Sequence, residues 1–452
     1  MTTLHLKKSI GRSSWRLALL LIPLVFACFA LSPMAQAVSP PPDGAYPGGN
    51  TAEGFNALFS LSTQDGGFNT AVGFYSLAAN VTGSLNTAVG AGALDLNTGH
   101  NNTATGAAAL LLNTADNNTA TGAAALLVNT TGTGNTATGA AALFSNVTGP
   151  GNTAVGALAL FSNTGDEEDP PNGRLNTAVG LNALTANTTG NGNTAVGAGP
   201  GQTSFGFSPA ALASNTTGNG NTAVGGTSGQ GTGALGNNTE GSLNTAVGGG
   251  ALRNNTTGSR NIALGVLAGN GVNTANDVIC IGTGGADVGG TTWIGGVYGV
   301  MTQSGTTAPV IVSDTGQLGT VASSERFKKD IATMEKASEA ILSLRPVTFH
   351  YKSDVKDFPQ FGLIAEEVAK VNPALVLPDK EGKPYTVRYD AVNAMLLNEF
   401  LKEHRKVEQL TKEFQTTVAQ QQKQIEALTT GLQKVSAQLE TSKPAPHVVN
   451  NP

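Results

Sequence analysis

A short unit in which polar and small apolar residues alternate recurs through the first half of the chain, with the pattern Asn-Thr/Ile-Ala-x-Gly. Side chains of a strand alternate between two faces, so the Thr and the variable residue share one face and the Ala lies on the other. Successive copies are mostly 16 or 17 residues apart, and longer spacings of up to 28 residues indicate inserted loops. The twelve copies begin at Asn50, Asn69, Asn86, Asn102, Asn118, Asn135, Asn152, Asn176, Asn193, Asn221, Asn244 and Asn261.

Most copies continue into an Ala-Leu pair and then a polar turn, as in Ala183-Leu184 and Asn187-Thr188-Thr189-Gly190. This pattern predicts two short strands and two turns in each repeat, which we call a rung. The glycine after the first strand permits a sharp corner that a side chain would obstruct. One rung cannot bury its apolar face alone, so the rungs of residues 38–276 must stack into a β-solenoid or β-roll. Small Ala and Val residues predict a thin interior, either within one coil or between chains.

The next residues, 277–322, predict a β-rich bridge. Val278–Gly282, Thr291–Gly299 and Pro309–Val321 are typical of short strands. Asp314-Thr315-Gly316 predicts a hairpin turn within the last of them.

Residues 323–396 predict a small α+β unit. The apolar spacing indicates two helices and two strands, followed by a hairpin. The helices are Met334–Leu344 and Ala365–Val371, the strands are Val347–Tyr351 and Phe361–Ile364, and the hairpin turns at Lys380-Glu381-Gly382-Lys383.

A heptad pattern sustained over residues 397–442 predicts a coiled coil rather than a single core helix. Ten of the thirteen a and d positions are apolar, and the polar ones could set the register and the number of strands. The heptads alone permit a dimer or a trimer, and we expect residues 443–452, with their prolines, to be disordered. The a and d positions are Leu397, Phe400, His404, Val407, Thr411, Phe414, Val418, Gln421, Ile425, Leu428, Leu432, Val435 and Leu439.

Residues 1–37 have the pattern of an export signal peptide. Four basic residues precede the apolar segment Leu17–Leu31, which is short for a membrane span, and Ala35-Gln36-Ala37 is a cleavage motif. We therefore expect a mature chain that begins at Val38, is secreted or stays at the cell surface, and has no stable membrane span. A lipoprotein signal that ends at Cys28 is the less favoured alternative.

Charge and cysteine content exclude several classes of function. Residues 38–322 contain 13 acidic and 3 basic residues, so this half of the chain gives nucleic acid no reason to bind. The mature chain holds one cysteine, Cys280, in an apolar run where a buried hydrophobe is expected rather than a reactive thiol. Cys and His residues do not occur at zinc-ligand spacings, so we expect neither a metal nor a cofactor.

Regular columns of Thr or Asn could form a flat face for an unknown surface ligand, such as a saccharide or ice. We favour the alternative, in which these side chains satisfy backbone groups along the solenoid. No ligand residues are assigned.

A serine and a lysine five residues apart, Ser323 and Lys328, lie at the start of the predicted α+β unit, directly after the β-rich bridge. Such a pair can act as nucleophile and base if the lysine is desolvated or lies near another cation, because both conditions lower a lysine's pKa. Arg326 and Lys329 are near in sequence. Taken alone, the spacing fits a basic surface stretch at the start of a helix better.

The repeats resemble the β-roll head repeats of trimeric autotransporter adhesins, which stack short Asn/Ala/Gly-rich rungs around a threefold axis. From Ser323 onward, ordered motifs resemble the intramolecular chaperone auto-processing domain of phage tail spikes and endosialidases. These motifs are Ser323-x-x-Arg326-x-Lys328-x-x-Ile331, Leu344-Arg345-Pro346-Val347-x-Phe349-x-Tyr351, Gly362-Leu363-Ile364-Ala365-Glu366-Glu367-Val368, Pro373-Ala374-Leu375-Val376 and Tyr389-Asp390-Ala391-Val392.

The second resemblance implies that Ser323 attacks the preceding peptide bond with Lys328 as base, so that cleavage falls between Ala322 and Ser323. It also implies that three chains assemble and that the chaperone guides folding of the β-structured fibre before cutting itself away. The family often has Asp at the position of Ser324 and Gln at that of Glu366, and neither difference removes the Ser-Lys pair.

We therefore expect an exported, homotrimeric fibre or adhesin-like surface protein. Its enzymatic activity is that of a single-turnover autoproteolytic serine endopeptidase without an external substrate. The alternative is an uncleaved structural surface protein with a C-terminal trimerisation cap and no peptidase activity.

Overall fold

The computed structural model describes residues 46–61, 66–166, 172–199, 202–203, 206–207, 209–227 and 231–442. The predicted signal peptide and the tail of residues 443–452 lie outside these ranges. The chain divides into two units, Met1–Gln303 and Ser304–Pro452, and each is described by itself.

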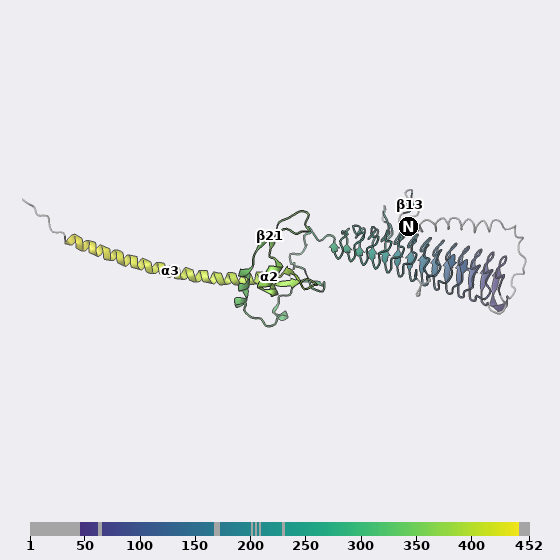
Figure 1. The fold of residues 1–452 in the computed structure, drawn as a ribbon, viewed down its shortest axis with the longest axis horizontal. Helices are drawn as coiled ribbons and strands as arrows, with labels where there is room; N and C mark the ends of the chain where they lie inside the picture. The colour runs from purple at the N-terminus through teal and green to yellow at the C-terminus, as the bar shows by residue number, and fades with distance from the viewer. Residues whose placement is uncertain are drawn as a thin grey trace, which may run out of the picture. The chain divides into compact units, whose positions relative to one another are not determined.

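The first unit contains a β-solenoid built around one parallel sheet of 14 strands (Figure 1). Neighbouring strands pair in register, so that Ala178 lies between Ala154 and Ala195 and equivalent positions of successive rungs form columns. This confirms the predicted solenoid. The strands are β1 (Thr51–Glu53), β2 (Thr70–Val72), β3 (Thr87–Val89), β4 (Thr103–Thr105), β6 (Thr119–Thr121), β8 (Thr136–Thr138), β9 (Thr153–Val155), β10 (Thr177–Val179), β11 (Thr194–Val196), β14 (Thr222–Val224), β15 (Thr245–Val247), β16 (Ile262–Leu264), β17 (Ile279–Ile281) and β18 (Thr292–Ile294).

The expectation of two strands in each rung is wrong for most of the rungs that the structure describes. The Ala-Leu pair lies in a turn, where the leucine adopts a left-handed backbone conformation, with φ of 51° at Leu94 and 50° at Leu143. The turn still bonds to the next rung, because the N–H of Leu94 donates to the carbonyl of Ala109 at 3.0 Å. Second strands occur as β5 (Leu112–Asn113) with β7 (Val128–Asn129), and a short insertion pairs β12 (Gln202–Thr203) with β13 (Gly206–Phe207).

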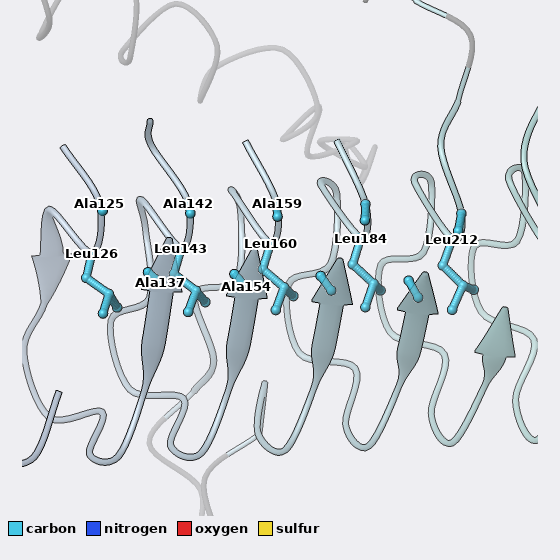
Figure 2. Packing of buried hydrophobic residues seen from close by; sticks show 14 of the residues in the cluster. Ala125, Leu126, Ala137, Ala142, Leu143, Ala154, Ala159, Leu160, Leu184 and Leu212 are labelled. Carbon is cyan, nitrogen blue, oxygen red and sulfur yellow. The ribbon is translucent and has the colours of Figure 1, made fainter. Parts of the chain in front are cut away.

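The interior of the solenoid is formed within a single chain by the strand alanines and the Ala-Leu pairs (Figure 2). Ala137 and Ala154 extend inward from the sheet, while Leu143 and Leu160 approach them from the opposite turn. All four are fully buried. The strand valines point outward instead, with 38% of Val72 exposed. The sheet therefore presents Thr and Val columns on its outer face, as the alternation predicted.

The glycine at the corner after most strands is required by close contact between rungs. Gly122 has a φ of +136°, and a Cβ atom on it would lie 2.5 Å from the carbonyl oxygen of Gly139. No side chain fits between backbones at this distance, and L residues rarely adopt this φ.

Two internal columns of asparagine hold the rungs together. In the first column, Asn69 Oδ1 accepts from the backbone N–H of Asn86 at 2.9 Å, and Asn86 Nδ2 donates to the carbonyl of Gly99 at 2.9 Å. In the second, Asn129 Nδ2 donates to Asn113 Oδ1 at 2.7 Å. These side chains are buried and bond along the stack, which supports the interpretation that they satisfy polar groups inside the solenoid.

The parallel stack continues to Ile294, beyond residue 276, where the repeat pattern ends in the sequence. Strand β17 pairs in register with β16, so that Cys280 takes the inward place of Ala263 and is buried. Val278 stands where the motif has Asn and Cys280 stands where it has Ala, so the last rungs do not match the sequence motif.

The second unit is a small α+β domain followed by a long helix, as predicted. A hairpin of β19 (Ile311–Val312) and β20 (Leu318–Gly319) confirms the turn at 314–316. The remaining elements are η2 (Glu325–Phe327), η3 (Glu335–Ser343), β21 (Val347–Phe349), β22 (Gln360–Gly362), α2 (Ala365–Val371), η4 (Pro373–Leu375), β23 (Val376–Pro378), β24 (Pro384–Val387) and α3 (Tyr389–Thr441). The pairs β21–β22 and β23–β24 are antiparallel, and η3 is a 3-10 helix.

Helix α3 spans 53 residues and carries the predicted heptads (Figure 1). Its apolar a and d side chains are exposed, with 65% of Phe400 and 56% of Val407 accessible. The coiled coil therefore stays a prediction. Among the described residues, no helix combines the length and apolar character that a membrane crossing requires.

Candidate active site

The segment that carries Ser323 and Lys328 is shaped by one short 3-10 turn. Element η2 begins after Ser324, whose backbone is extended with φ of −65° and ψ of 141°. The N–H of Phe327 donates to the carbonyl of Ser324 at 3.0 Å, and the N–H of Lys328 donates to that of Glu325 at 2.9 Å. The chain therefore turns back on itself between the serine and the lysine.

This turn brings the two predicted site residues into direct contact. Lys328 Nζ donates a hydrogen bond to Ser323 Oγ at 3.2 Å. Ala322, whose carbonyl carbon belongs to the predicted scissile bond, directly precedes the serine. The two atoms are within hydrogen-bond reach of each other, which is the distance a proton transfer between them would need.

The pair lies at the surface of the single chain. Every residue from Val321 to Thr333 is exposed. The predicted neighbouring cation Arg326 is stacked on the ring of Phe327, with its guanidinium carbon 4.6 Å from the ring centroid. Neither burial nor an enclosed cleft separates Lys328 from water.

An apolar groove lies elsewhere in the same unit, between η3, the β21–β22 hairpin and α3. It is lined by residues that include Ile341, Leu344, Val347, Phe361 and Leu396. These five side chains are apolar, and neither Ser323 nor Lys328 lines the groove.

Other candidate chemistry in the chain is structural. The described residues contain no cluster of three or more His, Cys, Asp or Glu side chains placed to hold a metal ion. Burial raises the pKa of the Cys280 thiol, while its hydrogen bond with the backbone of Gly269 acts in the opposite direction. A buried thiol with a raised pKa is a poor nucleophile.

Sequence analysis missed a polar cluster that joins η3 to α3. Ser338 Oγ donates to Glu399 Oε1 at 2.5 Å, and Lys402 Nζ donates to the same carboxylate oxygen at 2.7 Å. The hydrogen bonds from Lys402 and Ser338 lower the pKa of Glu399, and the bond to Glu399 raises the pKa of Lys402. The partners are about 60 residues apart, so no local sequence signal identifies them.

Comparison with known protein families gives a match in the C-terminal segment. A family model described as Chaperone of endosialidase matches residues 323–377, so the match begins at Ser323. No curated protein and no solved structure matches the chain. Residues 323–377 thus match the chaperone-of-endosialidase family model, and a β-solenoid of about 13 turns precedes them.

Proposed function

We propose that the chain is an exported, homotrimeric fibre or adhesin-like surface protein that cuts itself between Ala322 and Ser323. A chaperone-of-endosialidase domain behind a β-solenoid fits a tail-fibre-like protein, and the family implies autoproteolytic serine peptidase activity in general. In this proposal the C-terminal domain assists folding of the trimer and then separates from the solenoid. The solenoid is the lasting product.

The observation that carries the proposal is the 3.2 Å contact between Lys328 Nζ and Ser323 Oγ. It occurs at the first residue of the family match, where a cut would separate the repeat-containing part of the chain from the C-terminal segment. A lysine within hydrogen-bond reach of a serine can take the hydroxyl proton as the oxygen attacks.

The covalent steps follow from the position of the serine next to the bond it cuts. Ser323 Oγ attacks the carbonyl carbon of Ala322 while its proton passes to Lys328 Nζ. The C–N bond between the two residues then breaks, the lysine returns a proton to the new amino group of Ser323, and an ester joins Ala322 to the Ser323 oxygen. Water hydrolyses this ester, which leaves a carboxylate on Ala322 and restores the hydroxyl of Ser323. Each chain reacts once.

In this proposal, association of chains removes Lys328 from water, which the single chain does not do. A lysine serves as a base only in its uncharged form, which burial and nearby cations favour. Lys328 is exposed in the single chain, so we propose that a second copy covers it after assembly. The exposed a and d side chains of α3 are the surface through which three helices would associate.

The outer face of the solenoid sheet supports the same assembly. Among the residues of its 14 strands, Glu53 is the one charged residue. The remaining outward positions are mainly Thr, Val, Ile and Leu, many of them more than one third exposed. An uncharged face of this extent is typical of a surface that meets another protein, and a second copy of this chain is the partner we propose.

One observation favours the alternative of an uncleaved surface protein with a trimerisation cap. Both site residues are exposed, and Arg326 is engaged with Phe327. If assembly left Lys328 in water, the C-terminal unit would act only as a permanent cap.

Intact mass of the purified chain under denaturing conditions separates these proposals. The parent chain should give two fragments, one ending at Ala322 and one beginning at Ser323, whereas Ser323→Ala should give one full-length chain that still assembles. Ser324→Ala is the matched control and should cleave. A single full-length mass for the parent chain as well would refute self-cleavage and favour the cap.

A further inference from the structure

Ser338 lies in η3, on the C-terminal side of the candidate site in the sequence. Among the described residues of the second unit, Ser338 is the one polar residue that is fully buried. Burial of a hydroxyl is unfavourable unless its hydrogen-bonding capacity is used. The hydrogen-bond partners of Ser338 must therefore offset this cost.

The hydroxyl of Ser338 bonds to three side chains of helix α3 and to one carbonyl of its own helix. It donates to Glu399 Oε1 at 2.5 Å and accepts from Asn398 Nδ2 at 2.7 Å and from Lys402 Nζ at 3.4 Å. A serine hydroxyl offers one proton and two lone pairs. The proton is shared between Glu399 Oε1 and the carbonyl of Glu335, which lies 3.2 Å from Ser338 Oγ, and the lone pairs accept from Asn398 and Lys402. Asn398 Nδ2 also contacts the carbonyl of Glu335 at 3.3 Å, which fixes the start of η3 to the same helix. We call these residues the Ser338 cluster.

The cluster occupies the side of α3 away from the stripe of a and d positions, which we call the seam. With Leu397 at position a and Phe400 at position d, Asn398, Glu399 and Lys402 fall at positions b, c and f. Positions b, c and f face outward in a coiled coil, so η3 packs on the outside of the predicted bundle. The seam residues Leu397 and Phe400 stay free, at 59% and 65% exposure.

The Ser323–Lys328 contact is local, but the position of this segment relative to α3 depends on the attachment of η3. Residues 321–333 are exposed, and six residues separate Lys328 from Glu335, where η3 begins. Because only six residues connect them, the place of η3 on α3 limits where the Ser323–Lys328 segment can lie.

We propose that Ser338 is a positioning residue for self-cleavage, which rests on the proposed function. The Ser338 cluster fixes η3, and with it the segment of Ser323 and Lys328, at one place on the outward face of α3. When the helices associate along their a and d positions, each copy's segment is then held at a defined place beside its neighbours. Ser338 touches none of the reacting atoms and acts through the position of η3.

The test refolds the full chain from denaturant and follows cleavage by intact mass, with the rate expressed per assembled trimer. Ser338→Ala should slow cleavage on the order of tenfold, because it leaves the polar groups of Asn398 and Glu399 without their buried partner. The trimer should persist because the seam is unchanged. Ser343→Ala, an exposed serine of the same helix, is the control and should cleave at the parent rate.

Two further readouts separate positioning from a general loss of stability. The plateau of the pH–rate profile should fall in Ser338→Ala while its midpoint stays, since the base is unchanged. A double variant with Asn398→Ala should be little slower than Ser338→Ala alone, because both changes break one cluster. Parent-like cleavage by Ser338→Ala trimers, or an equal loss in Ser343→Ala, would overturn the proposal.

If the parent chain does not cleave, the proposed function fails, and amide hydrogen exchange still decides whether Ser338 anchors η3. Exchange over residues 323–343 should then rise in Ser338→Ala and not in Ser343→Ala, while the exchange of α3 beyond residue 404 stays unchanged. Unchanged exchange in residues 323–343 would show that the cluster does not hold this segment.

Discussion

Lys328 Nζ lies 3.2 Å from Ser323 Oγ because a single 3-10 turn separates the two residues. The turn is closed by backbone hydrogen bonds to the carbonyls of Ser324 and Glu325. The contact therefore depends on local geometry and is present in the isolated chain. What the isolated chain lacks is protection of the lysine from water.

Replacement of Lys328 should stop self-cleavage without affecting assembly. Lys328→Met removes the proposed base and keeps much of the side-chain length, so cleavage should slow by roughly 100-fold or more. The measurement is a time course of intact mass after refolding. Lys329→Met is the matched control, and cleavage at the parent rate in Lys328→Met would rule out the assigned base.

Disruption of the seam of α3 should abolish both assembly and cleavage if a second copy covers Lys328. Val418 is at an a position, so Val418→Asp would place a charge in each interface and should convert trimers to monomers, as read by light scattering. Lys423→Asp, at the outward f position, should leave assembly intact. Monomeric Val418→Asp that still cleaves at the parent rate would show that one chain suffices.

Much of the solenoid could be predicted because its rules are local. The twofold alternation of a strand places Ala88 inward and Thr87 outward, and the spacing of 16 or 17 residues sets the rung. The conformation of the Ala-Leu pair could not be predicted. Leucine avoids positive φ in isolation, and only the hydrogen bonds and core contacts of adjacent rungs hold Leu94 there.

The candidate site, like the solenoid, could be predicted from the sequence only in part. Ser323 and Lys328 could be identified because the ordered motifs around them resemble a known domain, although their spacing alone is a weak signal. The Ser338 cluster could not be identified, since Ser338 and Glu399 are brought together only by the packing of η3 on α3. The exposure of Lys328 is likewise a property of the folded chain that no motif records.

The corner glycines should be far less tolerant of substitution than other glycines with positive φ. Gly122→Ala would combine a φ of +136° with a backbone contact of 2.5 Å, so we expect a loss of roughly 3 kcal/mol or more. Gly134→Ala is the control, because its φ is +68° and nothing lies within 4 Å of the added atom. It should cost about 1 kcal/mol. Denaturant midpoints of the full chain measure both, and equal losses would contradict the close-contact explanation.

The last rungs of the solenoid should loosen in acid because a carboxylate holds their turn. Asp287 Oδ1 accepts from the backbone N–H groups of Asn273, Thr274 and Ala275 at 2.8 to 2.9 Å. Burial alone would raise the pKa of Asp287, but these hydrogen bonds outweigh it and the pKa lies below the ordinary aspartate value. A group with a lowered pKa stabilises the fold above its unfolded pKa of about 4, and this contribution is lost as the pH falls through the folded pKa.

Substitution of Asp287 tests this pH dependence directly. Asp287→Asn keeps an acceptor oxygen and removes the charge, so its thermal midpoint should lie below that of the parent chain at neutral pH. The difference should shrink as the pH is lowered below about 4, because the parent then loses the same charge. Asp314→Asn, in the exposed turn between β19 and β20, is the control and should show no such convergence. A difference between Asp287→Asn and the parent that stays constant from neutral to acidic pH would show that the hydrogen bonds to 273–275 do not depend on the charge.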